Sequence, residues 1–128
     1  MSEISIAIAD DNLQTLSLLN DILEGEEDFH VVGKADNGED AYYSFLTESY
    51  DLVLLDVMMP KMDGFTLCKK IREKEEIPIL FITAKVQEVD QLKGYELGCD
   101  DYIIKPFSLP VLLAKCNAIM NRKHYQFL

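Results

Sequence analysis

The sequence predicts an α/β protein with a single domain, in which a parallel sheet carries helices on both faces. Short apolar runs alternate with segments of helical periodicity along all 128 residues, which is the pattern of repeated strand–helix units. One run, Leu52–Leu55, shows no polar alternation, as expected of a strand covered on both faces. Four runs end directly in acidic, hydroxyl or amine side chains, and open α/β sheets keep their chemistry at that edge.

The first strand and helix occupy residues 4–25. Residues 4–9 are almost wholly apolar and predict a strand, after which Asn12 is the expected N-cap of a helix. Gly25 and the acidic residues after it end this helix. Its apolar stripe is formed by Leu16, Leu19 and Leu23, and is widened by Leu18 and Ile22.

The middle of the chain repeats this pattern. Residues 29–35 predict the second strand, and the Asn37-Gly38 turn leads into a helix over residues 39–48. Leu52–Leu55 is the third strand, and the helix after it has an apolar side formed by Phe65, Cys68 and Ile71.

The second half of the chain adds two strands and two helices. Glycine and proline residues mark the ends of these elements and the loop before the third helix. Pro60 and Gly64 mark the loop before the third helix, and Pro78 opens the fourth strand. Gly98 ends the fourth helix, and Pro110 lies in the first turn of the fifth. The two strands are residues 79–82 and 102–104. The apolar residues that mark the two helices are Val86, Val89, Leu92 and Leu97, and then Leu112, Leu113, Cys116, Ile119 and Met120.

The composition excludes nucleic acids and membranes as expected binding partners. The formal net charge of −11 repels nucleic-acid phosphates, so we expect no direct nucleic-acid binding by this chain. No apolar stretch approaches the roughly 20 residues that span a bilayer, and the first residues lack the form of a signal peptide. We therefore expect a cytoplasmic protein without a membrane partner. Cys68, Cys99 and Cys116 have neither zinc nor disulfide spacing and are expected to be buried apolar residues.

Polar residues should meet where the sheet changes direction. Both common doubly wound strand orders reverse at one place, and a crevice opens there. In the order 2-1-3-4-5, the crevice lies between the first and third strands, which end at Asp10, Asp11 and Asp56. Thr83 and Lys105 follow the fourth and fifth strands, so we expect all these side chains to converge on one point.

The carboxylates of this crevice suit a divalent cation, because they repel one another unless a positive charge lies between them. Mg²⁺ is the expected cofactor, since it is hard and favours carboxylates, water and phosphate oxygens; Mn²⁺ is the alternative. Zinc fits poorly, because neither His30 nor His124 and no cysteine belongs to the constellation.

Asp56 is the candidate nucleophile for a phosphoryl group. A carboxylate can attack phosphorus and hold the group as an acyl phosphate, and such a transfer needs positioning and charge neutralisation more than a strong base. Lys105 and Thr83 would each bind a phosphoryl oxygen, one through its ammonium and the other through its hydroxyl. Backbone amides after Asp56 and Thr83, including those of Met58 and Ala84, would complete the phosphate site.

Four segments resemble the receiver domains of two-component response regulators. They are ADDN (9–12), LLDVMMPKMDG (54–64), ITAK (82–85) and GCDDYIIKPF (98–107), and they agree with that family in order, spacing and identity. The resemblance covers residues 4–122. It implies a CheY-like, flavodoxin-like (βα)5 fold with the strand order 2-1-3-4-5. It also implies a receiver domain at residues 1–122, followed by a tail or the start of a linker at residues 123–128.

The resemblance assigns roles to the acidic residues. A sensor histidine kinase would be the partner that transfers a phosphoryl group to Asp56. Asp11, Asp56 and the backbone carbonyl of Met58 would ligate Mg²⁺, and Asp10 would act through water. Because Met58 offers no group to orient water, we expect slow to moderate self-dephosphorylation.

The resemblance also implies a conformational switch. Thr83 and Lys105 would bind the phosphoryl group, and the Lys105-Pro106 bond would be cis. Thr83 would then move toward the phosphate, and the ring of Tyr102 would turn inward into the vacated space. This change would remodel the face built from the fourth helix, the fifth strand and the fifth helix.

The segment at residues 100–107 is most like the OmpR/PhoB-like subfamily of winged-helix transcription regulators. Those receivers dimerise through the same face with crossed ion pairs, so we expect a homodimer when the domain is phosphorylated. The charges of that pattern are present at Lys93, Asp100, Asp101 and Arg122. However, Val111 replaces an acidic residue, and Lys115 replaces an arginine and loses its bidentate geometry. Residues 31–38 are more like other subfamilies, so the output class stays open.

Three other functions fit parts of the pattern less well. A phosphatase of the haloacid dehalogenase class needs a second Asp two residues after the nucleophile, where this chain has Met58. A flavodoxin-like cofactor binder needs a hydroxyl- and glycine-rich loop where this chain has Asp10-Asp11-Asn12. A pseudo-receiver that only binds partners would not need the complete constellation.

The sequence therefore predicts a Mg²⁺-dependent phospho-acceptor switch. It would catalyse its own phosphorylation and, slowly, its own dephosphorylation, without being a conventional turnover enzyme. Its output would be transcription, controlled through a DNA-binding domain that these 128 residues do not contain. The alternative is a stand-alone receiver that acts through protein–protein interaction.

Overall fold

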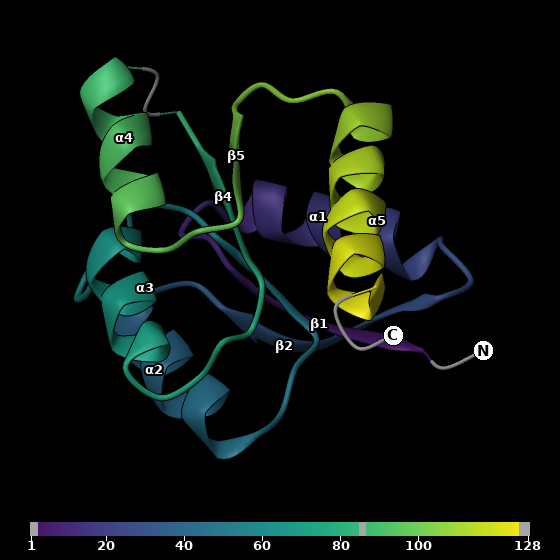
Figure 1. Ribbon diagram of the computed structural model, residues 1–128, viewed down its shortest axis with the longest axis horizontal. Coiled ribbons are helices and arrows are strands. Elements are labelled where there is room, and N and C mark those ends of the chain that lie inside the picture. The colour runs from purple at the N-terminus through teal and green to yellow at the C-terminus, as the bar shows by residue number, and fades with distance from the viewer. Residues whose placement is uncertain (1–2, 85–86, 126–128) are drawn as a thin grey trace.

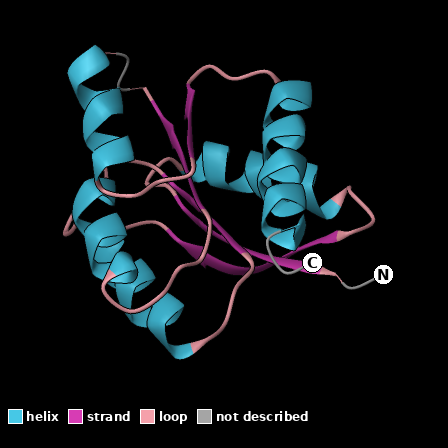
Figure 2. Cartoon of the chain, in the orientation of Figure 1, coloured by secondary structure: helices cyan, strands magenta, loops and turns pink. Residues whose placement is uncertain are grey.

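The chain folds into a five-stranded parallel sheet between two layers of helices (Figures 1 and 2). This computed structural model describes residues 3–84 and 87–125, apart from the side chains of Leu46 and residues 123–125. The strand order is β2-β1-β3-β4-β5 and every pairing is parallel, so the predicted fold class and strand order are confirmed. The strands are β1 (Ile4–Ala9), β2 (Phe29–Ala35), β3 (Leu52–Leu55), β4 (Ile79–Thr83) and β5 (Asp101–Ile104). The helices are α1 (Leu13–Glu24), α2 (Gly38–Thr47), α3 (Gly64–Arg72), α4 (Glu88–Glu96) and α5 (Leu109–Tyr125).

The sheet separates two apolar cores. Helices α1 and α5 cover one face, and α2, α3 and α4 cover the other (Figure 1). Alternate side chains of a strand enter opposite cores: in β3, Val53 and Leu55 lie beneath α2 and α3, whereas Leu52 and Leu54 lie beneath α1 and α5. All four β3 side chains are buried, which explains the absence of polar alternation in that strand.

Capping residues set the helix ends. Asn12 accepts a hydrogen bond from the backbone N–H of Thr15 and begins α1, and Gly25 is the C-cap of that helix. Asn37 caps α2 in the same way. Gly98 follows α4 with a φ of +99°, a left-handed conformation that favours glycine. The predictions for Asn12, Gly25 and Gly98 are therefore confirmed.

The fourth helix is present as predicted, but its apolar residues do not show how it contacts the sheet. Val89 and Leu92 of α4 are 65% and 53% exposed, and the buried residue of this helix is Gly94. The apolar residues correctly predict the presence of a helix here, but α4 approaches the sheet through Gly94, a residue without a side chain. Val86 lies outside the described residues.

Smaller differences concern helix lengths. The second helix spans Gly38–Thr47 rather than residues 39–48. Helix α5 continues to Tyr125, and the domain boundary at residue 122 stays a prediction. Within the described ranges, none of the helices is both long and apolar enough to cross a membrane.

The three cysteines are free and buried, as predicted. Burial raises the pKa of Cys68 to about 11 and the pKa values of Cys99 and Cys116 to about 12. These thiols are therefore neutral packing groups at physiological pH.

Arg72 connects the end of α3 to the loop between α4 and β5 through hydrogen bonds and an ion pair. Its guanidinium donates hydrogen bonds to the carbonyl oxygens of Gly98 at 3.0 Å and Ile77 at 2.5 Å, and it pairs with Asp100 at 3.1 Å. Asp100 also accepts a hydrogen bond from the backbone N–H of Ile79 at 2.7 Å. This Arg72 cluster joins the ends of α3 and α4 to the start of β4.

Candidate functional site

Strand register places two carboxylates side by side. Ala9 of β1 pairs with Leu55 of β3, so the residues that follow them, Asp10 and Asp56, leave the sheet at the same point. The backbone N–H of Asp56 donates to the carbonyl oxygen of Ala9 at 2.9 Å. Only 1% of Asp10 and 4% of Asp56 is exposed. Two buried carboxylates at one point require a counter-charge.

Lys105 supplies this counter-charge from the end of β5. Its Nζ lies 2.8 Å from Oδ2 of Asp10 and 3.2 Å from Oδ2 of Asp56. Its backbone N–H donates to the carbonyl oxygen of Thr83 at 2.8 Å, and the Lys105-Pro106 bond is cis, as expected. The Lys105 side chain is 21% exposed, so it is less buried than the two carboxylates that it contacts.

Asn12 has a second role that the sequence analysis missed. Its backbone N–H donates to Oδ1 of Asp10 at 2.9 Å, so both oxygens of this carboxylate are hydrogen-bonded. An Asp that accepts a hydrogen bond from the backbone two residues later forms an Asx turn. The spacing of Asp10 and Asn12 at a strand end is the signal that could have predicted it.

The buried ion pairs shift the pKa values of both partners. Burial raises the pKa of Asp10 and the Asp56 carboxylate adds to the rise, whereas hydrogen bonds from Lys105 and Asn12 oppose it. Burial lowers the pKa of Lys105, but its hydrogen bonds to Asp10 and the charges of both carboxylates outweigh burial, and the net shift is upward. Lys105 therefore stays charged at neutral pH, and this one ammonium faces two buried carboxylates.

Three acidic residues form a group that can hold a metal ion, and we call Asp10, Asp11 and Asp56 the acid group. One carboxylate oxygen from each lies within 4.8 Å of the others. Asp11 is exposed and the other two are buried, so the acid group is open to solvent on one side. Hard oxygen donors with an open side suit Mg²⁺, which keeps several waters and takes phosphate oxygens. The residues present therefore fit the predicted cation, and the ligand role of the Met58 carbonyl stays a prediction.

Thr83 and Ala84 lie beside Lys105. Thr83 is buried at the end of β4 and pairs with Ile104 of β5. Ala84 is exposed and lines a cavity of about 470 Å³ together with Lys105 and Pro106. The structure thus places the predicted phosphate-binding residues at one edge of the sheet, and their contacts with a phosphoryl group stay predictions.

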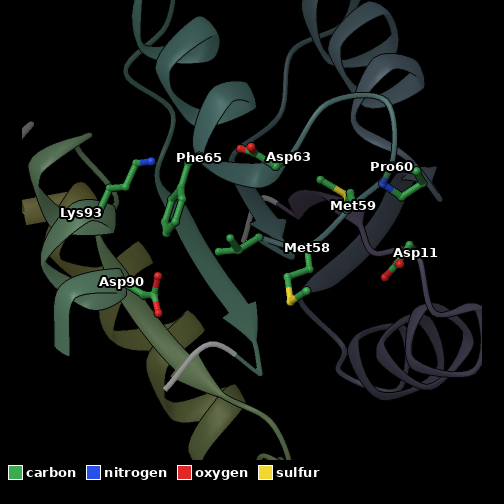
Figure 3. Close-up of a pocket in the computed structure, with 9 residues that line it drawn as sticks. Asp11, Met58, Met59, Pro60, Asp63, Phe65, Asp90 and Lys93 are labelled. Atoms are coloured by element: carbon green, nitrogen blue, oxygen red, sulfur yellow. The ribbon is translucent and has the colours of Figure 1, made fainter. Parts of the chain in front are cut away.

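A larger cavity of about 640 Å³ lies between the β3–α3 loop and α4 (Figure 3). Met58 lies in the middle of this view; its side chain is exposed, and its backbone N–H donates to Oδ1 of Asp56 at 3.3 Å. Asp11 borders the cavity on one side, and Phe65 and Lys93 border it on the other (Figure 3). The Nζ of Lys93 lies 4.9 Å from the centre of the Phe65 ring. Met58 therefore both lines this cavity and hydrogen-bonds to the Asp56 carboxylate.

The ring of Tyr102 is buried in the core beneath α3 and α4. Tyr102 is 6% exposed, and its ring centre lies 6.0 Å from that of Phe81. Burial, assisted by the nearby Asp90 carboxylate, raises the pKa of the Tyr102 hydroxyl to about 12. The ring of Tyr102 therefore packs inside this core, against Phe81.

This fold and site define a class of protein: a doubly wound α/β domain whose strand ends carry an acid group, a buried threonine and a lysine before a cis proline. The family model for the response regulator receiver domain matches residues 6–117. The chain belongs to the response regulator receiver domain family of two-component systems.

Its relatives include transcriptional regulators. The chain is 40% identical over 121 residues to the transcriptional regulatory protein ResD of Bacillus subtilis, which covers 94% of this chain and 50% of ResD. It is 42% identical over 120 residues to the transcriptional regulatory protein CpxR of Escherichia coli, with the same coverage of 94% and 50%. Both belong to the OmpR-like family, which confirms the predicted likeness to that subfamily. The chain spans about half the length of these two relatives.

Solved structures agree with this assignment. A two-component response regulator from Clostridium difficile superimposes with a TM-score of 0.89 at 34% identity and covers 94% of this chain and 98% of its own. The BeF3-activated receiver domain of DrrB superimposes with a TM-score of 0.84 at 31% identity. The match covers 93% of this chain and 98% of the DrrB domain. The predicted receiver fold is therefore confirmed.

Proposed function

We propose that this domain accepts a phosphoryl group on Asp56 from a sensor histidine kinase, in a reaction that depends on Mg²⁺ or Mn²⁺. The observation that supports this most directly is the position of the Lys105 ammonium, which contacts Asp10 and Asp56 at once. It is thereby held beside a carboxylate oxygen of Asp56, where the negative charge of an incoming phosphoryl group would arrive.

Asp56 is the attacking group. One of its carboxylate oxygens forms a bond to phosphorus, and the P–N bond to the donor imidazole breaks, with its electron pair leaving on the nitrogen. Lys105 exchanges its contact with Asp56 for a phosphoryl oxygen, and the hydroxyl of Thr83 donates to another. Backbone N–H groups of Met58 and Ala84 complete the phosphate site.

The divalent cation would be held by Asp10, Asp11, Asp56 and the backbone carbonyl of Met58. When bound, it supplies positive charge that neutralises the carboxylates and the oxygens of the transferring phosphoryl group. The domain would modify only itself and lose the group slowly, so it is a switch and not a turnover enzyme.

Incubation with acetyl phosphate and Mg²⁺, followed by intact mass analysis, tests this function. We expect the wild-type chain to gain one phosphoryl group, and to gain none when a chelator replaces the metal. A chain that stays unmodified with donor and metal present would refute the proposal.

We propose that the output is transcription, controlled through a DNA-binding domain outside this sequence. ResD and CpxR are transcriptional regulatory proteins of about twice the matched length, which supports this proposal. The alternative is a stand-alone receiver that acts through protein–protein interaction. Sequencing the coding region downstream of residue 128 distinguishes the two.

The surface for a homodimer would be the α4–β5–α5 face, formed by these elements at one edge of the sheet (Figure 1). Two of its expected interprotomer charges are already paired within the chain, because Asp100 contacts Arg72 at 3.1 Å and Asp101 contacts Lys115 at 2.9 Å. Apolar residues are exposed on the same helices at Val89, Leu92 and Val111. We therefore propose a dimer that depends on apolar contact more than on crossed ion pairs.

Leu92→Arg should abolish this dimer, because the change adds a charge to the apolar part of the α4–β5–α5 face. With beryllofluoride and Mg²⁺, we expect wild type to dimerise and Leu92→Arg to stay monomeric in light scattering after size-exclusion chromatography. Leu13→Arg is the matched control, since Leu13 is also exposed, at 65% against 53% for Leu92, but lies on α1. Equal dimerisation of the Leu92 and Leu13 variants would exclude this face.

Met58→Asn should shorten the lifetime of the acyl phosphate. The Met58 side chain is exposed next to Asp56 and has no group that orients water, whereas an amide can hydrogen-bond to an attacking water molecule. We expect phosphate loss to become several times faster, up to about tenfold, measured by following the phosphorylated mass after removal of the donor. Met58→Leu is the control and should behave as wild type. An unchanged rate in Met58→Asn would count against this role.

A further inference from the structure

Gly94 brings α4 into contact with a row of three aromatic rings. The ring centre of Phe81 lies 5.4 Å from that of Phe65 and 6.0 Å from that of Tyr102. Gly94 is the buried residue of α4 and faces this row. A Cβ atom placed on Gly94 would lie 3.3 Å from Cδ2 of Phe81 and 3.3 Å from Cδ2 of Tyr102.

The two rings differ in their freedom to move away from such an atom. Phe81 is fully buried in the central part of β4 and packs edge-on against Phe65, so it cannot retreat. Tyr102 lies on the edge strand β5, and the residue is 6% exposed. Carbon atoms normally pack at about 3.5–4.0 Å, so an added methyl group must displace either the Tyr102 ring or α4 itself.

Helix α4 begins without a side-chain cap. Its N-cap, Gln87, makes no side-chain capping hydrogen bond, and Val89 and Leu92 point to solvent rather than into the core. Glycine is also a poorer residue than alanine inside a helix. A glycine at the one buried position of α4 therefore requires an explanation from packing.

We propose that Gly94 is the positioning residue that allows the ring of Tyr102 to occupy its inward position, and that it thereby sets the balance of the switch at the α4–β5–α5 face. This inference rests on the proposed function, in which that face responds to Asp56. The absence of a side chain at Gly94 leaves the space that the inward ring fills.

Gly94→Ala tests the proposal in the full 128-residue chain labelled with 3-fluorotyrosine. The ¹⁹F NMR signal of Tyr102, assigned with Tyr102→Phe, reports the ring position, and hydrogen exchange reports the contact of α4 with the sheet. We expect the inward population of Tyr102 to fall at least about fivefold and exchange within Glu88–Glu96 to become faster. The variant should still gain one phosphoryl group on Asp56 from acetyl phosphate.

Two further variants separate a specific contact from a general loss of stability. Gly25→Ala adds the same methyl group at the exposed end of α1 and should leave the Tyr102 signal unchanged. Phe81→Leu in the Gly94→Ala background removes the ring that cannot retreat, and it should restore the inward Tyr102 signal. If Gly94→Ala alone does not fold, recovery of folding by Phe81→Leu supports the same contact.

Two results would contradict the role of Gly94. The proposal is overturned if the Tyr102 signal is unchanged in Gly94→Ala and hydrogen exchange in α4 is equal to or slower than in wild type. Alanine, the better helix former, would then fit at this position without strain. Failure of Phe81→Leu to reverse the effect would also overturn it. Failure of the proposed function is a separate result, since it appears as an unmodified wild-type chain and does not depend on the ring signal.

Discussion

Asp56→Asn is expected to take up no phosphoryl group from acetyl phosphate and Mg²⁺ under conditions in which wild type takes up one. The amide cannot supply the ionised oxygen that attacks phosphorus, so we expect the rate to fall at least about a thousandfold. The fold should persist, because Asn keeps the shape of the side chain and removes one of two buried negative charges beside Lys105. Intact mass analysis measures the uptake, and a thermal melt confirms folding.

Asp36→Asn is the matched control for this experiment. Asp36 follows β2 at the same edge of the sheet, but it is exposed and lies outside the acid group. This variant should be phosphorylated as wild type is. A phosphoryl group found on the Asp56→Asn chain would identify a different acceptor, and peptide mapping would then show which carboxylate had reacted.

Lys105→Gln should lower the free energy of unfolding by about 2–3 kcal/mol at neutral pH without a divalent cation. Breaking a buried ion pair by removing one partner costs about 3–5 kcal/mol, and the partial exposure of Lys105 reduces that loss. The change leaves the carboxylates of Asp10 and Asp56 buried without their ammonium. Urea denaturation in the presence of a chelator measures the loss. Lys115→Gln breaks the more exposed pair with Asp101 and should cost less than about 1 kcal/mol.

The loss in Lys105→Gln should depend on pH and metal. The pKa of Asp10 in the folded state is raised, so protonation of this carboxyl stabilises the fold as the pH falls through that raised value toward 3.8. The stability lost in Lys105→Gln should therefore be partly recovered over this pH range. The pKa of Lys105 is also raised, so its contribution in wild type is present below 10.5 and disappears as the pH rises through the higher folded value. Mg²⁺ should restore part of the lost stability. A loss that is the same in mild acid and at neutral pH, with and without Mg²⁺, would contradict this account of the site.

The convergence of the site residues could be predicted because it depends on strand ends and not on side-chain detail. The apolar runs before Asp10 and Asp56 identify β1 and β3, and parallel neighbours present their carboxyl ends at one edge of the sheet. Lys105 follows β5 in the same way. Its contact with both carboxylates at once could not be predicted, since it depends on the path of a single flexible side chain.

The orientation of α4 could not be predicted for a different reason. A period of 3.6 residues reveals that a helix has an apolar face, but it does not reveal whether the core or a partner covers that face. Val89 and Leu92 have the spacing of core residues and are exposed. Gly94, which makes the contact with the sheet, adds nothing to hydrophobic periodicity. The acceptors of Arg72 are backbone carbonyls, and these have no signature in the sequence.

The Arg72 cluster has a mechanical consequence for α4. It secures the C-terminal end of this helix to α3 and β4, whereas the opposite end has no side-chain cap. We therefore expect any displacement of α4 to be smallest near Gly98, beside this cluster, and largest at Glu88. A rearrangement beside Tyr102 should then move the start of α4 more than its end, with the Arg72 cluster as the fixed point.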